Sequence, residues 1–345
     1  MAYTTINKSS IHMNNKIYTG NGSSSHGITG VGFKPDWTWI KSRSNTTDHI
    51  LTDIVRGVTV SIKSNTSAGN ATDSNHLKSF NSDGFTLGAE NDVNGNSRTY
   101  ASWNWKAGGS QGSANTAGSI NTTYTSVNTT AGFSISQYTG TGSNATVGHG
   151  LGSGNIPKMI IVKKLNGADS WTIYHASLGA TKKINFDTGA AGTQSDRWND
   201  TSPTDTLFSI GTNGSVNANN ATYVAYCFAE KQGYSKFGSY TGNGNANGTF
   251  VYTGFKPAFV IMKRTNSTGS WHIHDAKRPS YNDTELTLKA ESNAAEDTGY
   301  NLDLLSNGFK LRNVGASQND SGGNYIYMAF GQSLVGTNNI PATAR

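Results

Sequence analysis

The chain has 345 residues, a formal net charge of +6 and only 14% charged residues, and it contains 41 glycines and five glutamates. Strong helix formers are scarce, which excludes a mainly helical protein and predicts an all-β fold with Gly- and Asn-rich turns. The single cysteine excludes an intrachain disulfide framework, and basic residues never run longer than two, which excludes a basic arm or helix for nucleic acid.

In chain order, the sequence divides into three units separated by less regular segments. Residues 1–16 precede the first unit and are a candidate anchor. The units cover residues 17–107, 137–231 and 232–335. A Gly/Ser/Asn/Thr-rich segment, 108–136, links the first two units, and residues 336–345 form a C-terminal tail. This organisation predicts three tandem homologous β-sandwiches of the jelly-roll or lectin-like type.

The division depends on residues that recur at matched spacing. Each unit opens with Tyr-Thr-Gly-x-Gly, has a proline 17 to 19 residues later, and closes with a tyrosine followed by an aromatic residue at +5. Each unit also has a lysine six residues after the proline, at Lys41, Lys163 and Lys263. The structural repeat signature consists of Tyr18, Pro35, Phe85, Tyr100, Trp105, Tyr138, Pro157, Phe208, Tyr223, Phe228, Tyr240, Pro257, Phe309, Tyr325 and Phe330.

The segments that follow the prolines and those that close the units are predicted to be strands. Each closing segment alternates, so residues two apart share one face of a sheet. Cys227 stands where the other units have Asn104 and Ala329, and we interpret it as a packing residue. Asn-Gly and Asp-Gly pairs between the strands predict tight turns.

The carboxylates do not form a recurring catalytic pattern. A glycosidase needs two carboxylates across the scissile bond. None of the five glutamates recurs among the units, and Asp53 and Asp275 are matched by His175 in the second unit. We therefore expect a non-enzymatic protein with no catalytic residues, and a polysaccharide depolymerase is the least favoured alternative.

Metal and cofactor binding are weakly indicated. His272 and His274 would lie on one face of a strand and are the candidate metal ligands, but no third ligand has a suitable spacing. Gly-x-Gly strings lack a following helix that could bind phosphate. We expect no cofactor.

Carbohydrate binding is the favoured class of ligand recognition. β-Sandwich modules hold sugars with exposed aromatic faces and with Asn and Asp side chains. Trp198, Tyr281 and Tyr300 lie outside the recurring pattern in loop-like sequence, so we expect them to be exposed and consider them the candidate ligand-binding residues.

Several motifs together resemble a known family. These are the Tyr-Thr-Gly-x-Gly opening, the string Gly-Phe-Lys-Pro, the turn 81–85 (Asn-Ser-Asp-Gly-Phe) and the ending 100–105 (Tyr-Ala-Ser-Trp-Asn-Trp). Over residues 1–335 the chain resembles an uncharacterised repeat domain of virion structural proteins, of tail-fibre or decoration type, in marine tailed bacteriophages. The second unit departs from the pattern, with Gly-Asn-Ile-Pro in place of Gly-Phe-Lys-Pro.

The resemblance implies a surface-exposed virion protein. The leading hypothesis is a tail fibre or tail-associated adhesin that contacts host surface glycans, and the alternative is a capsid decoration (cement) or tail connector protein without a ligand. Expected partners are other capsid or tail proteins, host surface polysaccharide and further copies of the chain, with a trimer favoured by closed symmetry. We expect assembly in the host cytoplasm, no nucleic-acid binding and no membrane insertion.

Overall fold

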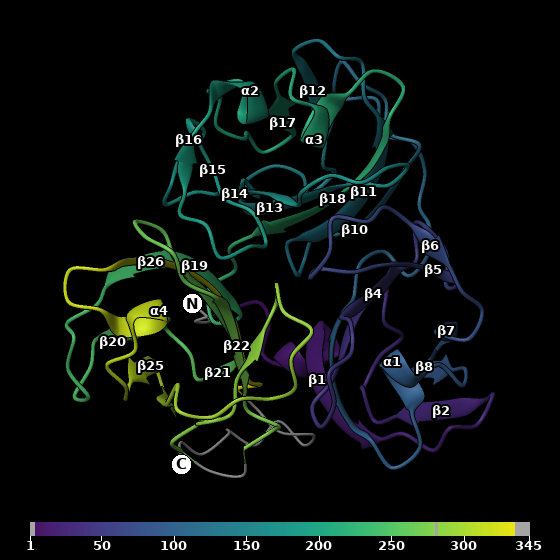
Figure 1. The fold of residues 1–345 in the computed structure, drawn as a ribbon. Coiled ribbons are helices and arrows are strands. Elements are labelled where there is room, and N and C mark those ends of the chain that lie inside the picture. Colours follow the sequence, from purple (N-terminus) through teal and green to yellow (C-terminus); the bar gives the residue numbers. More distant parts are fainter. Residues whose placement is uncertain (1–3, 280–281, 335–345) are drawn as a thin grey trace.

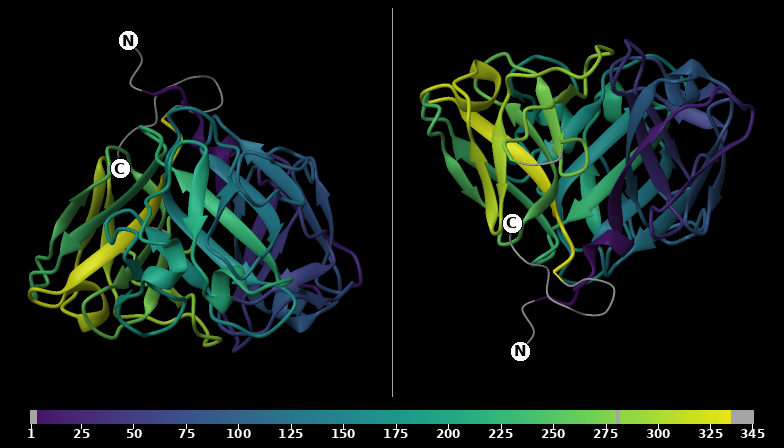
Figure 2. Two further views of the ribbon diagram at one scale, coloured as in Figure 1. Left: turned by 90° about the horizontal axis from the view of Figure 1, so that it is seen from above. Right: turned by 90° about the horizontal axis from the view of Figure 1, so that it is seen from below.

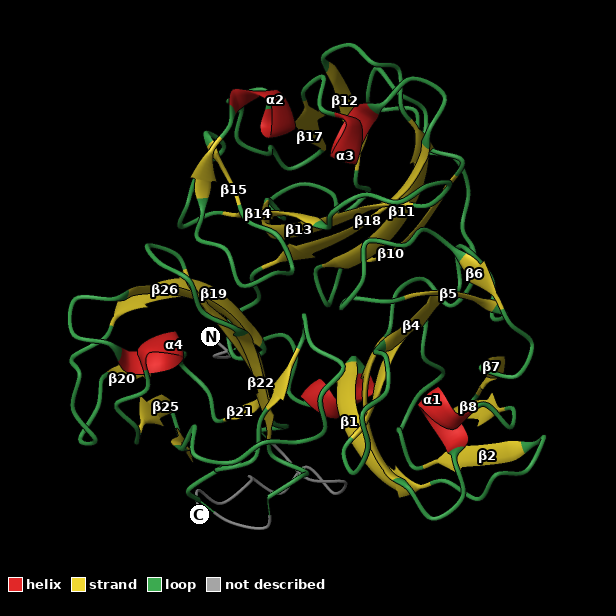
Figure 3. Cartoon of the chain, in the orientation of Figure 1, coloured by secondary structure: helices red, strands yellow, loops and turns green. Residues whose placement is uncertain are grey.

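The computed structural model describes residues 4–279 and 282–334 and is dominated by antiparallel strands, with only short helices (Figure 3). The predicted all-β sandwich fold is confirmed. The strands form three lobes arranged around a common centre (Figure 1). We call them sandwich 1 (residues 13–105), sandwich 2 (124–229) and sandwich 3 (235–331).

Sandwich 1 has a large sheet of order β1–β9–β3–β4–β5–β6 and a small sheet of order β2–β8–β7. A 3-10 turn, η1 (Ser9–Ile11), precedes it. Its elements are β1 (Met13–Thr19), β2 (His26–Thr29), β3 (Trp37–Ser42), β4 (Ile50–Asp53), β5 (Val60–Ile62), β6 (Ala71–Thr72), β7 (Leu77–Asn81), β8 (Gly84–Leu87), α1 (Asn91–Asn94) and β9 (Thr99–Trp105).

Sandwich 2 has a large sheet of order β10–β11–β18–β13–β14, the small sheet β12–β17 and the hairpin β15–β16. Its elements are β10 (Tyr124–Asn128), β11 (Phe133–Thr139), β12 (Ala145–Gly148), β13 (Pro157–Lys164), β14 (Thr172–His175), β15 (Lys182–Lys183), β16 (Gly192–Thr193), α2 (Ser195–Trp198), β17 (Leu207–Ile210), α3 (Gly214–Asn217) and β18 (Thr222–Ala229).

Sandwich 3 has a large sheet of order β19–β26–β21–β22–β23 and a small sheet of order β20–β25–β24. Its elements are β19 (Ser235–Thr241), β20 (Phe250–Tyr252), β21 (Pro257–Arg264), β22 (Trp271–Asp275), β23 (Leu288–Lys289), β24 (Leu302–Leu305), β25 (Gly308–Leu311), α4 (Ala316–Asn319) and β26 (Asn324–Gly331).

The three large sheets use the same pairing at matched residues. In each, the closing strand lies between the opening strand and the strand after the proline. The opening tyrosine is paired in register with the closing tyrosine, at Tyr18↔Tyr100, Tyr138↔Tyr223 and Tyr240↔Tyr325. These rings stack in every sandwich, with centroids 4.9 to 5.2 Å apart. The spacing of the signature thus has a geometric basis, whereas the homology of the units stays a prediction.

The stacked tyrosines fix the short helix that precedes each closing strand. In sandwich 1, the Tyr18 hydroxyl donates to the carbonyl of Val93 and the Tyr100 hydroxyl donates to that of Asn91, each at 2.7 Å. The buried Asn94 at the end of α1 then donates to the carbonyls of the adjacent loops. Gly20 is required there, because a Cβ atom on it would lie 2.3 Å from a backbone oxygen. Asn217 and Asn319 play the same part in the other sandwiches.

The outer face of each large sheet packs on its own small sheet. Three separate apolar clusters result, and Phe85, Phe208 and Phe309 lie at their centres. Each phenylalanine is at most 1% exposed. Every sandwich therefore has a core of its own between its two sheets.

The inner faces of the three large sheets pack on one another and form one central core. Its side chains form layers, because the inward-facing residues of each closing strand are paired in register with those of the strand after the proline. The outermost layer contains Trp37, Trp105, Met159, Phe228, Phe259 and Phe330, and the next contains Trp39, Trp103, Ile161, Tyr226, Ile261 and Met328. Rings from different sandwiches stack directly, as in Trp37 against Tyr226, with centroids 4.5 Å apart.

The segment assigned to a linker contributes to sandwich 2. Residues 124–128 form β10 and residues 133–136 belong to β11, both in its large sheet. Of the predicted N-terminal segment, residues 13–16 belong to β1. The predicted tail, 336–345, lies outside the described residues.

We expect that a single unit does not fold alone. A fragment of residues 17–107 would expose the inner face of its large sheet, including Trp37, Trp39, Trp103 and Trp105, all 0% exposed in the whole chain. Circular dichroism during a urea titration should show no cooperative transition for the fragment, whereas residues 4–334 should unfold cooperatively. A sigmoidal transition and dispersed amide spectrum from the fragment would contradict this expectation.

Candidate functional site

The three sandwiches are joined by a closed ring of equivalent hydrogen bonds. Eight residues after each recurring lysine, the sequence has an aromatic side chain, which is His49, Trp171 or Trp271. Each of these side chains contacts a neighbouring sandwich: sandwich 2 contacts sandwich 1, sandwich 3 contacts sandwich 2, and sandwich 1 contacts sandwich 3. His49 Nε2 lies 3.1 Å from the carbonyl of Lys289, Trp171 Nε1 donates to Lys63 at 3.0 Å, and Trp271 Nε1 donates to Asn185 at 2.7 Å. Each sandwich therefore gives one such contact and receives one.

A second ring of contacts joins the ends of β4, β14 and β22 to the closing strands. The Asp53 carboxylate accepts from the Tyr226 hydroxyl at 2.7 Å, and Asp275 accepts from Trp103 Nε1 at 3.0 Å. The matched residue in sandwich 2 is His175, and the third closing strand has Met328 at the position of Trp103 and Tyr226. Because Met328 has no hydrogen to donate, a carboxylate there would lack this partner, and His175 instead lies 3.1 Å from the carbonyl of Tyr327.

Two of these interfaces contain a buried arginine that the third lacks. Three residues after the aspartates, Arg56 and Arg278 form ion pairs with Asp53 and Asp275, each at 2.6 Å. In sandwich 2 this position is Leu178.

The residue that accepts a hydrogen bond from the arginine at the first two interfaces is also replaced at the third. Arg56 reaches Asn70 and Arg278 reaches Glu296. The backbone amides of Asn70 and Glu296 donate to the neighbouring sandwich, as does that of Ala191. Ala191 thus occupies the matched position between sandwiches 2 and 3. At this interface, Leu178 and Ala191 are shorter and apolar compared with the arginine and its acceptor at the other two.

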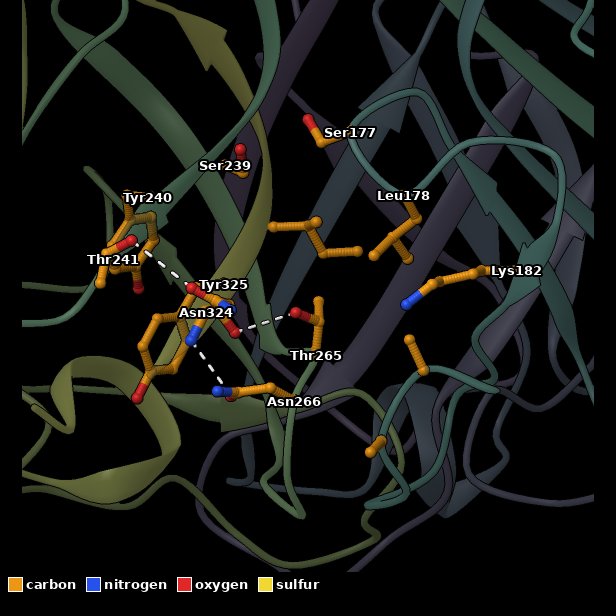
Figure 4. Close-up of a pocket in the computed structure, with 13 residues that line it drawn as sticks. Ser177, Leu178, Lys182, Ser239, Tyr240, Thr241, Thr265, Asn266, Asn324 and Tyr325 are labelled. Atoms are coloured by element: carbon orange, nitrogen blue, oxygen red, sulfur yellow. Dashed lines mark hydrogen bonds between the residues drawn. The ribbon is translucent and has the colours of Figure 1, made fainter. Parts of the chain in front are cut away.

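A cavity of 470 Å³ lies at this third interface (Figure 4). Its size suits a small-molecule or sugar site. Leu178 and Ala191 line it from sandwich 2, and Thr265 and Ile326 line it from sandwich 3. The remaining lining residues are Ser177, Lys182, Ala190, Ser239, Tyr240, Thr241, Asn266, Asn324 and Tyr325. We call this cavity the 2–3 groove.

The groove combines an apolar floor with hydroxyl and amide groups. Thr265 Oγ1 donates to the Asn324 carbonyl at 3.1 Å, and the Asn324 amide donates to Asn266 Oδ1 at 3.1 Å (Figure 4). Lys182 is the one charged side chain among the described residues that line it. The arrangement can bind a polar ligand, and its described lining contains no carboxylate pair for glycoside hydrolysis.

A second cavity of 350 Å³ lies where all three sandwiches meet. It is lined by Asn65, Thr66, Ser67, Ser170, Trp171, Phe186, Asp187, Thr188 and Glu291. Asp187 accepts from the Gly189 amide at 2.8 Å, and Glu291 accepts from the Trp271 amide at 3.0 Å. Both carboxylates hold the surrounding loops together, so we interpret this cavity as part of the junction.

The recurring lysines lie on the inner faces of the large sheets, one layer beyond the central aromatic rings. Lys41, Lys163 and Lys263 are each 0% exposed. Their ammonium groups donate to backbone carbonyls, and Lys163 reaches the carbonyl of Ser67 in sandwich 1 at 3.1 Å. Burial lowers the pKa of each lysine to about 8, while nearby carboxylates act in the opposite direction.

The candidate metal ligands are buried side by side. His272 lies 3.3 Å from Thr287 Oγ1, and His274 lies 2.8 Å from Gln318 Nε2. Burial lowers the pKa of His272 to about 3, so the ring is neutral. Among residues 4–279 and 282–334, no group of three or more His, Cys, Asp or Glu residues is placed to hold a metal ion.

The expected exposure of Trp198 is wrong. This residue is 1% exposed, because it packs inside sandwich 2 with its ring 5.7 Å from that of Tyr174. Tyr300 is half-buried with its ring 4.2 Å from that of His272. Tyr281 lies outside the described residues. Loop-like sequence was a poor guide to exposure here, since the short helix α2 directs its apolar side chain inward.

Other residues singled out from the sequence also have structural partners. Asp53 and Asp275 are tied to arginines at two different interfaces, so they do not face each other across a shared cavity. Cys227 is buried in sandwich 2, and burial raises the pKa of its thiol.

Among residues 4–279 and 282–334, the exposed aromatic residues are Phe250 and Tyr252, which the sequence analysis did not single out. They are 43% and 60% exposed on β20, and Val251 between them is buried. Register matches Val251 with Ile28 and Val147, since all three pair with the signature phenylalanines. The outward positions that flank Ile28 and Val147 carry only glycine or threonine. The sequence could have indicated this, because residues 250 and 252 lie two apart in a strand and so share the face opposite Val251.

We expect the free energy of unfolding to rise from pH 8 to pH 9. Lys41, Lys163 and Lys263 have a pKa of about 8 when folded and 10.5 when unfolded, so the unfolded chain binds more protons in this window. Urea titrations at intervals of half a pH unit would measure the slope. The K163M variant should have a shallower slope, and an unchanged slope would contradict the assignment to these lysines.

We also expect Leu178 and His175 to be energetically coupled. L178R alone places a cation in the 2–3 groove without the aspartate that accompanies it elsewhere. Adding H175D supplies that aspartate, so the double variant should be more stable than the sum of the single effects by about 1–3 kcal/mol. A double-mutant cycle from urea unfolding measures the difference, and strictly additive effects would refute the equivalence of the interfaces.

Within residues 4–279 and 282–334, no helix has the length and apolar character to cross a membrane.

Comparison with known proteins gives one family. No curated protein matches the chain. A family model described as "Domain of unknown function (DUF7483)" matches residues 8–333, a span that includes all three sandwiches and the segments between them. The match covers most of the chain, and the chain therefore belongs to this DUF7483 family.

Proposed function

We propose that the chain is a non-enzymatic phage virion protein, a tail fibre or tail-associated adhesin that contacts host surface glycans. The exposed ring pair Phe250 and Tyr252 is the observation that carries the glycan-binding part. The two side chains project from the same face of an edge strand, about 7 Å apart along it. Aromatic faces of this kind stack on the apolar faces of sugar rings.

The surroundings of the pair also support sugar contact. Lys310 lies opposite Phe250 in register on β25, and Asp303 on β24 lies next to it and pairs with Arg312 at 2.6 Å. The rings are therefore accompanied by Lys310 and Arg312, which can hydrogen-bond sugar hydroxyls, while the buried Asp303 holds Arg312 in place. Sandwiches 1 and 2 lack the rings, so the described part of each chain presents one such surface and strong attachment would need several copies.

The positions of the described ends favour attachment at one end of the body. The amide of Leu334 donates to the carbonyl of Asn7 at 3.0 Å, and Ser333 Oγ donates to Ser10 Oγ at 2.9 Å. β1 and β26 approach this same end (Figure 2). Contact with other virion proteins here would leave the opposite end and the outer surfaces of the sandwiches accessible.

The same paired ends favour the second candidate, a capsid decoration or tail connector protein without a ligand. Docking through residues 4–12 and 331–334 requires no sugar site. Cryo-electron microscopy of the particle separates the two: density on the tail with sandwich 3 pointing outward supports the adhesin, and density on the capsid lattice supports decoration.

We expect the double variant F250A/Y252A to bind host polysaccharide at least about tenfold more weakly, because two apolar ring contacts are lost. Immobilised surface polysaccharide from bacterial hosts and biolayer interferometry would provide the measurement. V314A is the matched control, since Val314 is also an exposed apolar residue of sandwich 3, at 62%. Equal affinities for wild type and the double variant would refute the role of the rings.

A further inference from the structure

The 2–3 groove differs from the other two interfaces in charge as well as in volume. Ile184 pairs with Ile173 as Ile62 pairs with Leu51 and Leu288 pairs with Ile273. Two residues before these paired positions, sandwich 2 has Lys182, sandwich 1 has Val60 and sandwich 3 has Leu286. The amine is therefore found only at the interface that has lost its arginine.

Lys182 points toward the interior of the groove (Figure 4). No described residue forms an ion pair with it, and no described carboxylate lines the groove. Arg56 and Arg278 are neutralised by aspartates at the other interfaces. The groove thus presents a positive charge whose counter-ion is not supplied by the described part of the chain.

The opposite wall is held in place by its own hydrogen bonds. Thr265 and Asn266 fix the backbone of Asn324 from both sides. The Asn324 side chain is exposed, and its amide nitrogen donates to no described residue, so it is available to a ligand. Leu178 and Ile326 supply the apolar surface between this wall and Lys182.

We infer that the 2–3 groove binds an acidic sugar residue, such as a hexuronate, within a polysaccharide. The sugar carboxylate would pair with Lys182, its hydroxyls would hydrogen-bond Asn324 and the neighbouring hydroxyl side chains, and its C–H face would pack on Leu178 and Ile326. The inference rests on the proposed glycan-binding function and names the chemical class of glycan. It uses residues separate from Phe250 and Tyr252.

The first experiment compares sodium glucuronate with glucose and sodium acetate by titration of the whole chain, followed by amide chemical shifts. We expect glucuronate to bind more tightly than either control, because only glucuronate supplies both the anion and the sugar hydroxyls. K182Q should weaken glucuronate binding about tenfold, the usual effect of losing one charge-assisted hydrogen bond. K183Q, a change in the adjacent lysine outside the groove lining, should leave the affinity unchanged.

A second variant tests whether glucuronate binds in the 2–3 groove by filling the groove with larger side chains. H175D/L178R places in the groove the Asp–Arg pair that occupies the first interface, and it should abolish glucuronate binding. Its urea midpoint and amide spectrum verify that the fold is retained. Should it fail to fold, K182Q and K183Q still decide the matter, because both changes are at the surface.

The outcomes separate this inference from the proposed function. Equal binding of glucuronate and acetate, or a K182Q variant that binds like wild type, would overturn the acidic-sugar site even if polysaccharide binding through Phe250 and Tyr252 remains. Lys182-dependent glucuronate binding without adsorption to any host polysaccharide would support the groove and overturn the adhesin.

Discussion

The packing of three large sheets around one aromatic core is the constraint on which the rest of the molecule depends. Each small sheet covers only the outer face of its large sheet, so the inner face needs the other two sandwiches. Trp37 stacks on Tyr226 of the second sandwich, and Trp105 contacts Phe259 of the third. Because this apolar area is buried by all three sandwiches together, we expect the body to unfold as one unit.

A closed ring of interfaces also limits which polar residues can be buried between the sandwiches. Asp53 and Asp275 are tolerated because each receives a side-chain hydrogen bond and an arginine. At the third interface, Met328 stands at the position of Trp103 and Tyr226, His175 at that of the aspartates and Leu178 at that of the arginines. The three substitutions follow from one physical requirement, since an unpaired carboxylate or guanidinium in a buried interface is costly.

Much of the fold could be predicted from the sequence, because alternation and spacing report on local pairing. Tyr18 and Tyr100 were each identified by a spacing that recurs in the other units, and the structure adds that the two are paired in register. Contacts between units were not visible, because His49 and Lys289 are 240 residues apart and nothing in their local sequence indicates the partner. Trp198 was misjudged for a related reason: this residue of helix α2 packs on Tyr174, which lies in strand β14, distant in the sequence. The groove lies where Leu178 replaces an arginine, and this difference can be recognised only when the three interfaces are compared in the structure.

Covalent linkage of the three sandwiches has a consequence for binding that a symmetric trimer could not provide. In a homotrimer of one sandwich, every interface would be identical, so replacing arginine by leucine would open three grooves and remove all three buried ion pairs. In this chain, Arg56 and Arg278 keep two interfaces filled while Leu178 opens the third. The buried ion pairs of two interfaces are therefore kept, while the third has room for the ligand proposed above. On the virion proposed above, several sites would come from several copies of the chain, an arrangement in which multivalency makes weak individual contacts effective.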